Sequence, residues 1–259
     1  MRLAILSVVL FLSGISALIF ETLWLRLSGL AFGNSIWAAA LILSSFMAGL
    51  ALGTAIAASA KLQRVRPLKF YAALEIAVAV FGCTIVFALP ILGELLRPLF
   101  QALWSHQTIL LGLRVLISFV ILLAPTTAMG LTLPVIMEDR ALANAQFGRA
   151  IGILYGFNTL GAVAGALIGE LFLIKAFGLL GTSLAAGMLN VIAAVVALLL
   201  SRSEERPTRP PLQPHESPRS RFTFDYQLPW RLLIVSFGAG CALLALEVIW
   251  FRFLRLYVA

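Results

Sequence analysis

Residues 14–26 read GISALIFETLWLR, and residues 240–252 read GCALLALEVIWFR. Both stretches are apolar, yet each holds a glutamate, a tryptophan and an arginine in the same order and at the same spacing. The offset that aligns Glu21 with Glu247 also matches Leu18 with Leu244 and three further residues of the motif. The repeated motif comprises Gly14, Glu21, Trp24 and Arg26 in the first copy, and Gly240, Glu247, Trp250 and Arg252 in the second. The chain therefore contains an internal repeat whose polar residues lie in apolar surroundings.

The composition indicates the class of protein. Hydrophobic residues make up 61% of the 259 positions and charged residues 12%, with a mean hydropathy of +1.03, whereas soluble domains carry about 25% charged residues. An apolar run of about 20 residues can cross a bilayer as a helix. Such runs occupy residues 3–25, 35–60, 70–92, 108–133, 150–174 and 178–200, and another opens at 230. The runs are continuously apolar rather than alternating, which favours helices over barrel strands. The sequence therefore predicts an all-α membrane protein.

The first apolar run has an alternative interpretation. Arg2, the apolar stretch after it and the small residues around Ser16 also fit a cleaved signal peptide. A signal peptide has no reason to recur after residue 230, however, so the internal repeat favours a retained span.

A polar segment divides the chain. Residues 201–222 read SRSEERPTRPPLQPHESPRSRF, which is rich in proline and charge and poor in apolar residues, as is typical of a solvated linker. We therefore expect a six-helix transmembrane half at 1–200, a cytoplasmic polar linker at 201–229 and the first helix of a second repeat at 230–259. Two parallel halves of this kind occur in transporters. The second half has only begun at Ala259, so we expect the chain to be a fragment of a longer protein.

The basic residues predict the orientation. They concentrate in alternate connections, with few in the others beyond Arg97 and Lys175, and the formal net charge is +8. The group comprises Lys61, Arg64, Arg66, Lys69, Arg140, Arg149, Arg202, Arg206, Arg209, Arg219 and Arg221. The positive-inside rule then puts the N-terminus and the linker in the cytoplasm. The expected location of the spans is the inner (plasma) membrane of a bacterium. The bilayer is the expected partner, and no nucleic acid is, because the basic residues are dispersed among spans.

Glycines four residues apart predict close helix packing, because they let two backbones approach. The pairs are Gly49 with Gly53 and Gly152 with Gly156, and a longer row holds Gly161, Gly165 and Gly169. A surface that lines a transport pathway is the alternative for these positions.

Three charged residues within the spans are candidates for binding a substrate or ion. Each costs on the order of 3 kcal/mol at the bilayer centre unless it is paired or hydrated. Counting from the cytoplasmic end at 1.5 Å per residue, Glu21 and Glu170 lie roughly 30 Å along their helices, and Arg114 lies about 9 Å from the outer end. Their shared depth permits a Glu21–Arg114–Glu170 cluster. A structural ion-pair role and contact with a cation or proton both remain open.

Other polar residues near the spans have more ordinary interpretations. Glu21 and Arg26 are separated by about 140° on one helix, so their partners should lie on other helices. The alternative interpretation of Arg26 is a side chain that extends to the membrane interface, and that of Trp24 and Trp250 is a pair of aromatic anchors at the interface. Glu75, near the cytoplasmic face, is close enough to pair with the basic loop before it.

Two uncharged candidates lie in the fifth span. Tyr155 and Asn158 could contact a substrate, and interhelical hydrogen bonding is the alternative for both. His106 and His215 lie in separate polar segments without metal-ligand spacing, so neither a metal nor a cofactor is expected.

Four segments in this order carry a resemblance to a known family. They are SGISALIFETLWLRLSGLAFGNSIWAAALILSSFMAGLALG (13–53), RPLKFYAALE (66–75), APTTAMGLTLPVI (124–136) and GRAIGILYGFNTLGAVAGALIGELFLIKAFGLLGT (148–182). Together they resemble the membrane region of the fused major facilitator/spermidine synthase family. The resemblance implies a major-facilitator-like six-helix half plus the first helix of a second half. It also implies a transporter-like module that handles a polyamine or another cation.

The resemblance leaves an alternative function. The chain could be a membrane anchor or scaffold for a cytosolic aminopropyltransferase-like domain that uses decarboxylated S-adenosylmethionine. No glycine-rich nucleoside-binding loop with a downstream acidic residue occurs in the 259 residues, so we expect no enzymatic activity from them. The expected protein partners, a second helical half or a synthase-like domain, would lie beyond residue 259.

Overall fold

The computed structural model describes residues 2–32, 36–58, 66–139 and 147–202, together with parts of 234–249. The chain divides into two compact units, Met1–Arg202 and Ser203–Ala259. In the second unit Gly240 lies in a helical stretch at 237–243, whereas Glu247, Trp250 and Arg252 lie outside the described residues.

Every described element of the first unit is helical. In chain order they are α1 (Arg2–Phe32), α2 (Ile36–Ala57), α3 (Pro67–Ala102), α4 (Gln107–Met137), α6 (Phe147–Ile168), the π-helical turn η2 (Gly169–Leu173) and α7 (Ile174–Arg202). Four stretches are long and apolar enough to cross a membrane: Arg2–Ser28, Pro67–Ala102, Gln107–Met137 and Gly148–Arg202. Ile42–Ala57 of α2 is a shorter apolar helix. These elements confirm the predicted all-α fold and fit an integral membrane protein.

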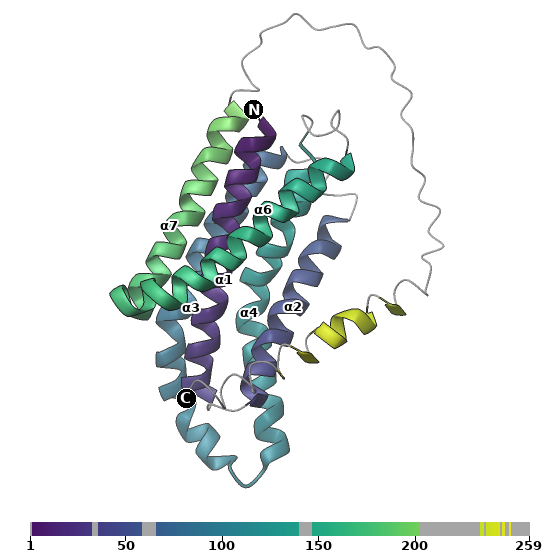
Figure 1. Ribbon diagram of the computed structural model, residues 1–259. Helices are drawn as coiled ribbons and strands as arrows, with labels where there is room; N and C mark the ends of the chain where they lie inside the picture. The colour runs from purple at the N-terminus through teal and green to yellow at the C-terminus, as the bar shows by residue number, and fades with distance from the viewer. Residues whose placement is uncertain are drawn as a thin grey trace, which may run out of the picture. The chain divides into compact units, whose positions relative to one another are not determined.

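The last apolar stretch, Gly148–Arg202, reverses its direction at one residue. Gly178 has φ 66° and ψ −173°, a conformation that side chains disfavour and glycine tolerates. Figure 1 shows α6 and η2 running one way and the main part of α7 returning beside α1 and α3. The reversal separates the two apolar runs that the sequence predicted at 150–174 and 178–200.

Helices α3 and α4 extend beyond the apolar runs predicted for them at 70–92 and 108–133. Their hairpin projects past the other helices at one end of the bundle (Figure 1). A helix of 36 residues such as α3 is about 54 Å long, more than a bilayer core requires. Pro90 and Pro98 lie inside α3 without ending it.

Helix α1 lies at the centre of the packing. Its most extensive contacts are with α6 and then α7 and α3, while α2 packs mainly on α4 and α3 on α7 and α4. Buried side chains follow α1 along most of its length, from Leu6 to Leu27, and the fully buried Phe20 and Trp24 stack with ring centroids 5.7 Å apart. The interface-anchor interpretation of Trp24 is therefore wrong, because its ring lies in the core.

Glycines bring α1 and α6 into backbone contact. A methyl group at Gly161 would overlap the carbonyl oxygen of Phe11, and one at Gly165 would overlap that of Ile15. Gly14 meets the backbone of α6 in the same way. The two helices therefore run parallel in a fixed register. An advance of four residues from Gly161 to Gly165 on α6 corresponds to an advance of four residues from Phe11 to Ile15 on α1.

A second glycine crossing joins α2 to α4. A methyl group at Gly49 would overlap Thr126, and one at Gly53 would overlap the backbone of α4. From the other side, a methyl group at Gly130 would overlap the carbonyl oxygen of Leu50. Close packing, as predicted from the spacing, is what these positions provide.

The remaining predicted packing glycines differ among themselves. A methyl group at Gly169 would lie 3.2 Å from Cγ1 of Ile19, a tight contact with α1. At Gly152 and Gly156 it would meet no described atom within 4 Å. Gly152 is nine residues from Gly161, which is about 180° around the helix, so it faces away from α1. Within the described bundle the expectation of packing is not met at these two positions.

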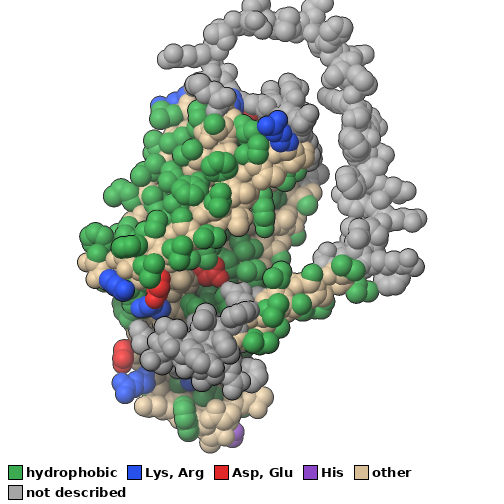
Figure 2. All heavy atoms as spheres, viewed as in Figure 1, with side chains coloured by type: hydrophobic (Ala, Val, Ile, Leu, Met, Phe, Trp, Pro, Cys, Tyr) green, Lys and Arg blue, Asp and Glu red, His purple; other side chains and the backbone are tan. Residues whose placement is uncertain are grey.

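Charged side chains gather toward the ends of the bundle and hydrophobic side chains cover the band between them (Figure 2). Arg2 at the start of α1 pairs with Asp139 after α4 at 2.8 Å, which ties these two termini together. Described basic residues that belong to this end are Arg2, Arg66, Lys69, Arg149 and Arg202. The opposite end carries Arg26, Glu94, Arg97, Glu170 and Lys175.

Candidate functional site

The structure joins Glu170 to Arg26. Glu170 lies in η2, and its carboxylate forms an ion pair with the guanidinium of Arg26 on α1. The side chains are 45% and 48% exposed. As predicted, the partner of Arg26 lies on another helix. An ion pair this exposed contributes little to stability, typically below about 1 kcal/mol, so its charges remain accessible to a ligand.

The register of α1 and α6 places this pair. Because Gly165 faces Ile15 and Gly169 faces Ile19, the residue after Gly169 arrives beside the last turns of α1. The chain then widens into the π-helical turn, a feature frequent at functional sites. Glu170 is thus presented at the surface of the end at which α1 finishes.

Glu21 lies five residues before Arg26 on α1, and only 8% of it is exposed. It is much less accessible than Glu170, although the sequence assigned both residues the same depth. The two acids therefore differ in environment, one buried and one beside solvent or headgroups.

Arg114 does not join the two glutamates in the described contacts. Its guanidinium carbon lies 5.2 Å from the centroid of the Phe100 ring, a cation–π distance. Phe100 and Leu110 form the small apolar cluster that closes the α3–α4 hairpin. Helix α4 packs mainly on α2 and α3, whereas Glu170 lies on the α6 side of α1. The predicted Glu21–Arg114–Glu170 cluster is therefore replaced by an Arg26–Glu170 pair and a separate Arg114–Phe100 contact.

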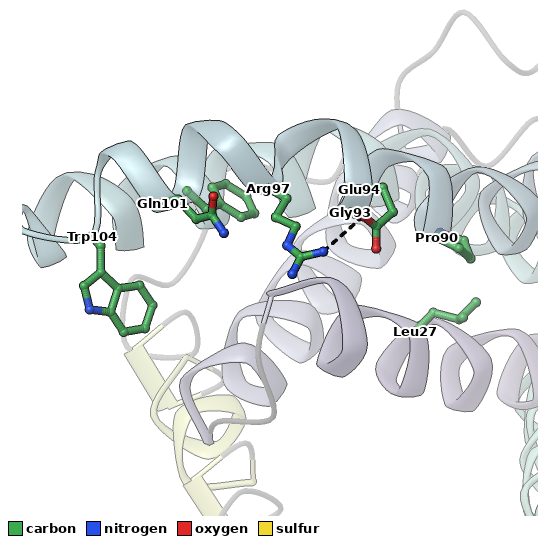
Figure 3. Close-up of a pocket in the computed structure, with 8 residues that line it drawn as sticks. Leu27, Pro90, Gly93, Glu94, Arg97, Gln101 and Trp104 are labelled. Atoms are coloured by element: carbon green, nitrogen blue, oxygen red, sulfur yellow. Dashed lines mark ion pairs between the residues drawn. The ribbon is translucent and has the colours of Figure 1, made fainter.

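A pocket of about 460 Å³ lies between the end of α1 and the outer half of α3. Leu27 of α1 forms one wall, and Glu94, Arg97, Phe100 and Trp104 line the other (Figure 3). Arg97 pairs with Glu94 at 3.5 Å, and both side chains are mostly exposed. The sequence did not single out this pocket, because its walls are distant in sequence.

The two uncharged candidates, Tyr155 and Asn158, lie on α6 away from the ion pair. Tyr155 is 59% exposed and shares the outward-facing side of the helix with Gly152. The backbone carbonyl of Asn158 lies against Gly14 at the α1–α6 crossing. Neither side chain is brought to Glu170 by a described contact.

The structure reveals that Glu75, which the sequence placed near the cytoplasmic face within reach of the basic loop, is a buried acid. Glu75 is 1% exposed, and its Oε1 accepts a hydrogen bond of 2.7 Å from Oγ of Ser13 on α1. Its Oε2 is buried and has no hydrogen-bond partner among the described residues. The expected pairing with the basic loop is therefore wrong: Glu75 points into the bundle.

The period of α3 contains the signal that was missed. Leu68, Tyr71, Glu75, Val78 and Gly82 follow the three-and-four spacing of one helix face, and all are buried. Assigning that face to the core would have assigned Glu75 to it as well.

No group of three or more His, Cys, Asp or Glu side chains that could hold a metal ion occurs in the described part of the chain. Comparison of the chain with protein-family models, curated proteins and solved structures finds no match in any of the three.

Proposed function

We propose that residues 1–202 are one half of a transporter-like membrane module, whose acidic residues Glu170 and Glu21 attract a polyamine or another cation. The family resemblance suggests the substrate class and a second helical half. The N-terminus would be cytoplasmic in a bacterial inner membrane, because the end that holds Arg2 and Arg202 carries the larger basic group.

The pattern of helix contacts is the observation that carries this proposal. The first three helices of the bundle can be compared with the last three. In this comparison α1 corresponds to α4, α2 to α6 and α3 to α7. Under this correspondence the α1–α6 contact matches the α2–α4 contact, and the α3–α4 contact matches the α1–α7 contact. The α3–α7 contact matches itself. These are the five most extensive helix contacts. Each helix runs opposite to its counterpart, as in the inverted repeats nested within halves of major facilitator transporters.

The glycines at the helix crossings follow the same correspondence between the first three helices and the last three. Gly161 and Gly165 of α6 press on α1, and Gly49 and Gly53 of α2 press on α4. A membrane anchor needs apolar length and a stable bundle, but it does not need two matched crossings. This correspondence therefore favours a transporter-like module over an anchor, and any aminopropyl transfer would belong to a separate synthase-like domain.

Uptake by the complete protein in proteoliposomes tests the proposal. We expect Glu170→Gln and Glu21→Gln to lower the uptake of labelled spermidine by about tenfold or more, since a charged partner is worth about 1.5–3 kcal/mol. Glu94→Gln is the matched control, an exposed acid at the same end of the bundle. Folded yield and size-exclusion profile should be unchanged. A chain that binds and moves no polyamine or other cation, with variants that alter only yield, would support the scaffold function.

A further inference from the structure

We propose that Glu75 is an intramembrane proton-binding site enclosed by α1, α3 and α7, which holds its proton in the structure described here and releases it only when these helices separate. The site uses residues distinct from Arg26 and Glu170, so it stands whether or not the chain transports a polyamine.

The immediate surroundings of Glu75 are polar but uncharged. Ser13 donates to Oε1, and this leaves Oε2 without a described partner. The Tyr71 hydroxyl, one helical turn away, is fully buried beside Glu75 and Ser13 and makes no hydrogen bond of normal geometry. A proton on Oε2 would give this carboxyl one donor and one acceptor, and the Tyr71 oxygen offers an acceptor.

Helix α7 supplies a further unpaired group. Asn190 is 1% exposed, and neither of its amide atoms has a hydrogen-bond partner among the described residues. Gly187 of α7 faces Cys83 and Ala79 of α3. Since α3 and α7 run in opposite directions, Asn190 lies one turn from Gly187 toward the level of Glu75. Its carbonyl is a second candidate acceptor for the proton.

No described side chain supplies a balancing positive charge. The other charged residues of this helix and the neighbouring helices are Arg2, Glu21 and Arg26 on α1, Lys69, Glu94 and Arg97 on α3, Arg114 on α4 with Glu138 just after it, and Lys175 and Arg202 on α7. None forms a described ion pair with Glu75. Lys69 is six residues away, about 9 Å along α3. An ionised carboxylate here would be buried without a counter-charge, so the neutral acid is the form that the closed bundle accommodates.

Release of the proton therefore requires a change in the helices. An ionised Glu75 needs water or a cation, and neither can reach a 1% exposed carboxyl while α1, α3 and α7 remain packed. The interface is held by Ser16, which donates to the carbonyl of Ala186 at 3.0 Å, and by Cys83, which donates to that of Ser183 at 3.3 Å. Opening it would increase the exposure of Cys83, which is half-buried in the packed bundle.

Infrared titration of the complete protein in lipid vesicles tests the site, with Cys241 replaced by serine so that Cys83 is the reporter thiol of the chain described here. We expect a protonated-carboxyl band at neutral pH that is lost in Glu75→Gln and kept in Glu94→Gln. As the band disappears on raising the pH, alkylation of Cys83 by N-ethylmaleimide should become about tenfold or more faster than in Glu75→Gln at the same pH, beyond the rise that thiolate formation causes in both proteins, and this difference is the expected signature of local opening.

The Ser13→Ala variant provides a second test of the same site if Glu75→Gln folds poorly. Loss of the donated hydrogen bond should shift the same band to higher frequency in this variant. Absence of the band at neutral pH, or its loss without faster alkylation, would overturn the proposal. So would a band that responds to sodium at constant pH. Spermidine uptake is not measured, so these failures are distinct from failure of the proposed transport.

Discussion

Replacing Gly165 by alanine should destabilise the bundle by about 1–3 kcal/mol or more, the usual cost of overpacking a tight contact. The added methyl group would overlap the carbonyl oxygen of Ile15, which is backbone and cannot rotate away. Relief therefore requires α1 and α6 to move apart along their whole crossing. Thermal unfolding of the purified protein in detergent should show the loss as a lower midpoint.

Gly152→Ala is the matched control on the same helix. No described atom lies within 4 Å of the added methyl group, and alanine favours helix by about 1 kcal/mol over glycine. The midpoint should therefore stay constant or rise slightly. An equal loss at both positions would contradict the crossing as described and would mean that the outward side of α6 is also packed.

Replacing Trp24 by alanine should cost about 3–5 kcal/mol, because a fully buried indole leaves a cavity that its neighbours cannot fill. Phe20 stacks on the ring, and Phe46 lies 6.4 Å away between centroids. Both would lose a partner. Chemical unfolding followed by circular dichroism would measure the change.

Trp24→Phe should cost much less than the alanine variant. Phenylalanine fills most of the space, and it removes an indole N–H that is buried without a partner among the described residues. If both the alanine and the phenylalanine variants lost little free energy of unfolding, the core position of Trp24 would be contradicted. A position at the membrane interface would then be favoured.

Apolar run length was enough to predict the helical class and the approximate place of each described helix in residues 2–202. The requirement to satisfy backbone groups in lipid leaves few alternatives to a helix, so length is a strong signal. Gly178 was not anticipated as the reversal point, although the break between the runs at 150–174 and 178–200 fell beside it. The extensions of α3 and α4 were missed because they carry charges and prolines, which resemble loop sequence.

The side that each helix turns to its neighbours was harder to predict. Gly152 with Gly156 and Gly161 with Gly165 have the same spacing, yet only the second pair meets another helix. The motif specifies that close approach is possible and does not specify a partner. Glu75 was misplaced for a related reason, since a depth estimate ignores rotation about the helix axis. Rotation points this carboxyl at Ser13 instead of the loop.

The π-helical turn that carries Glu170 holds more residues per turn than the α-helices on either side. It therefore behaves like a one-residue insertion confined to a single turn. Deleting one residue from it would restore α-helical winding, with the side chains of that turn again about 100° apart around the axis, while the helices on either side keep nearly the same orientation. Such a deletion would change the direction in which Glu170 points relative to Arg26 while leaving the composition of the membrane segment almost intact. Substitutions would thus change which charges are present, and the deletion would change only the direction in which Glu170 points.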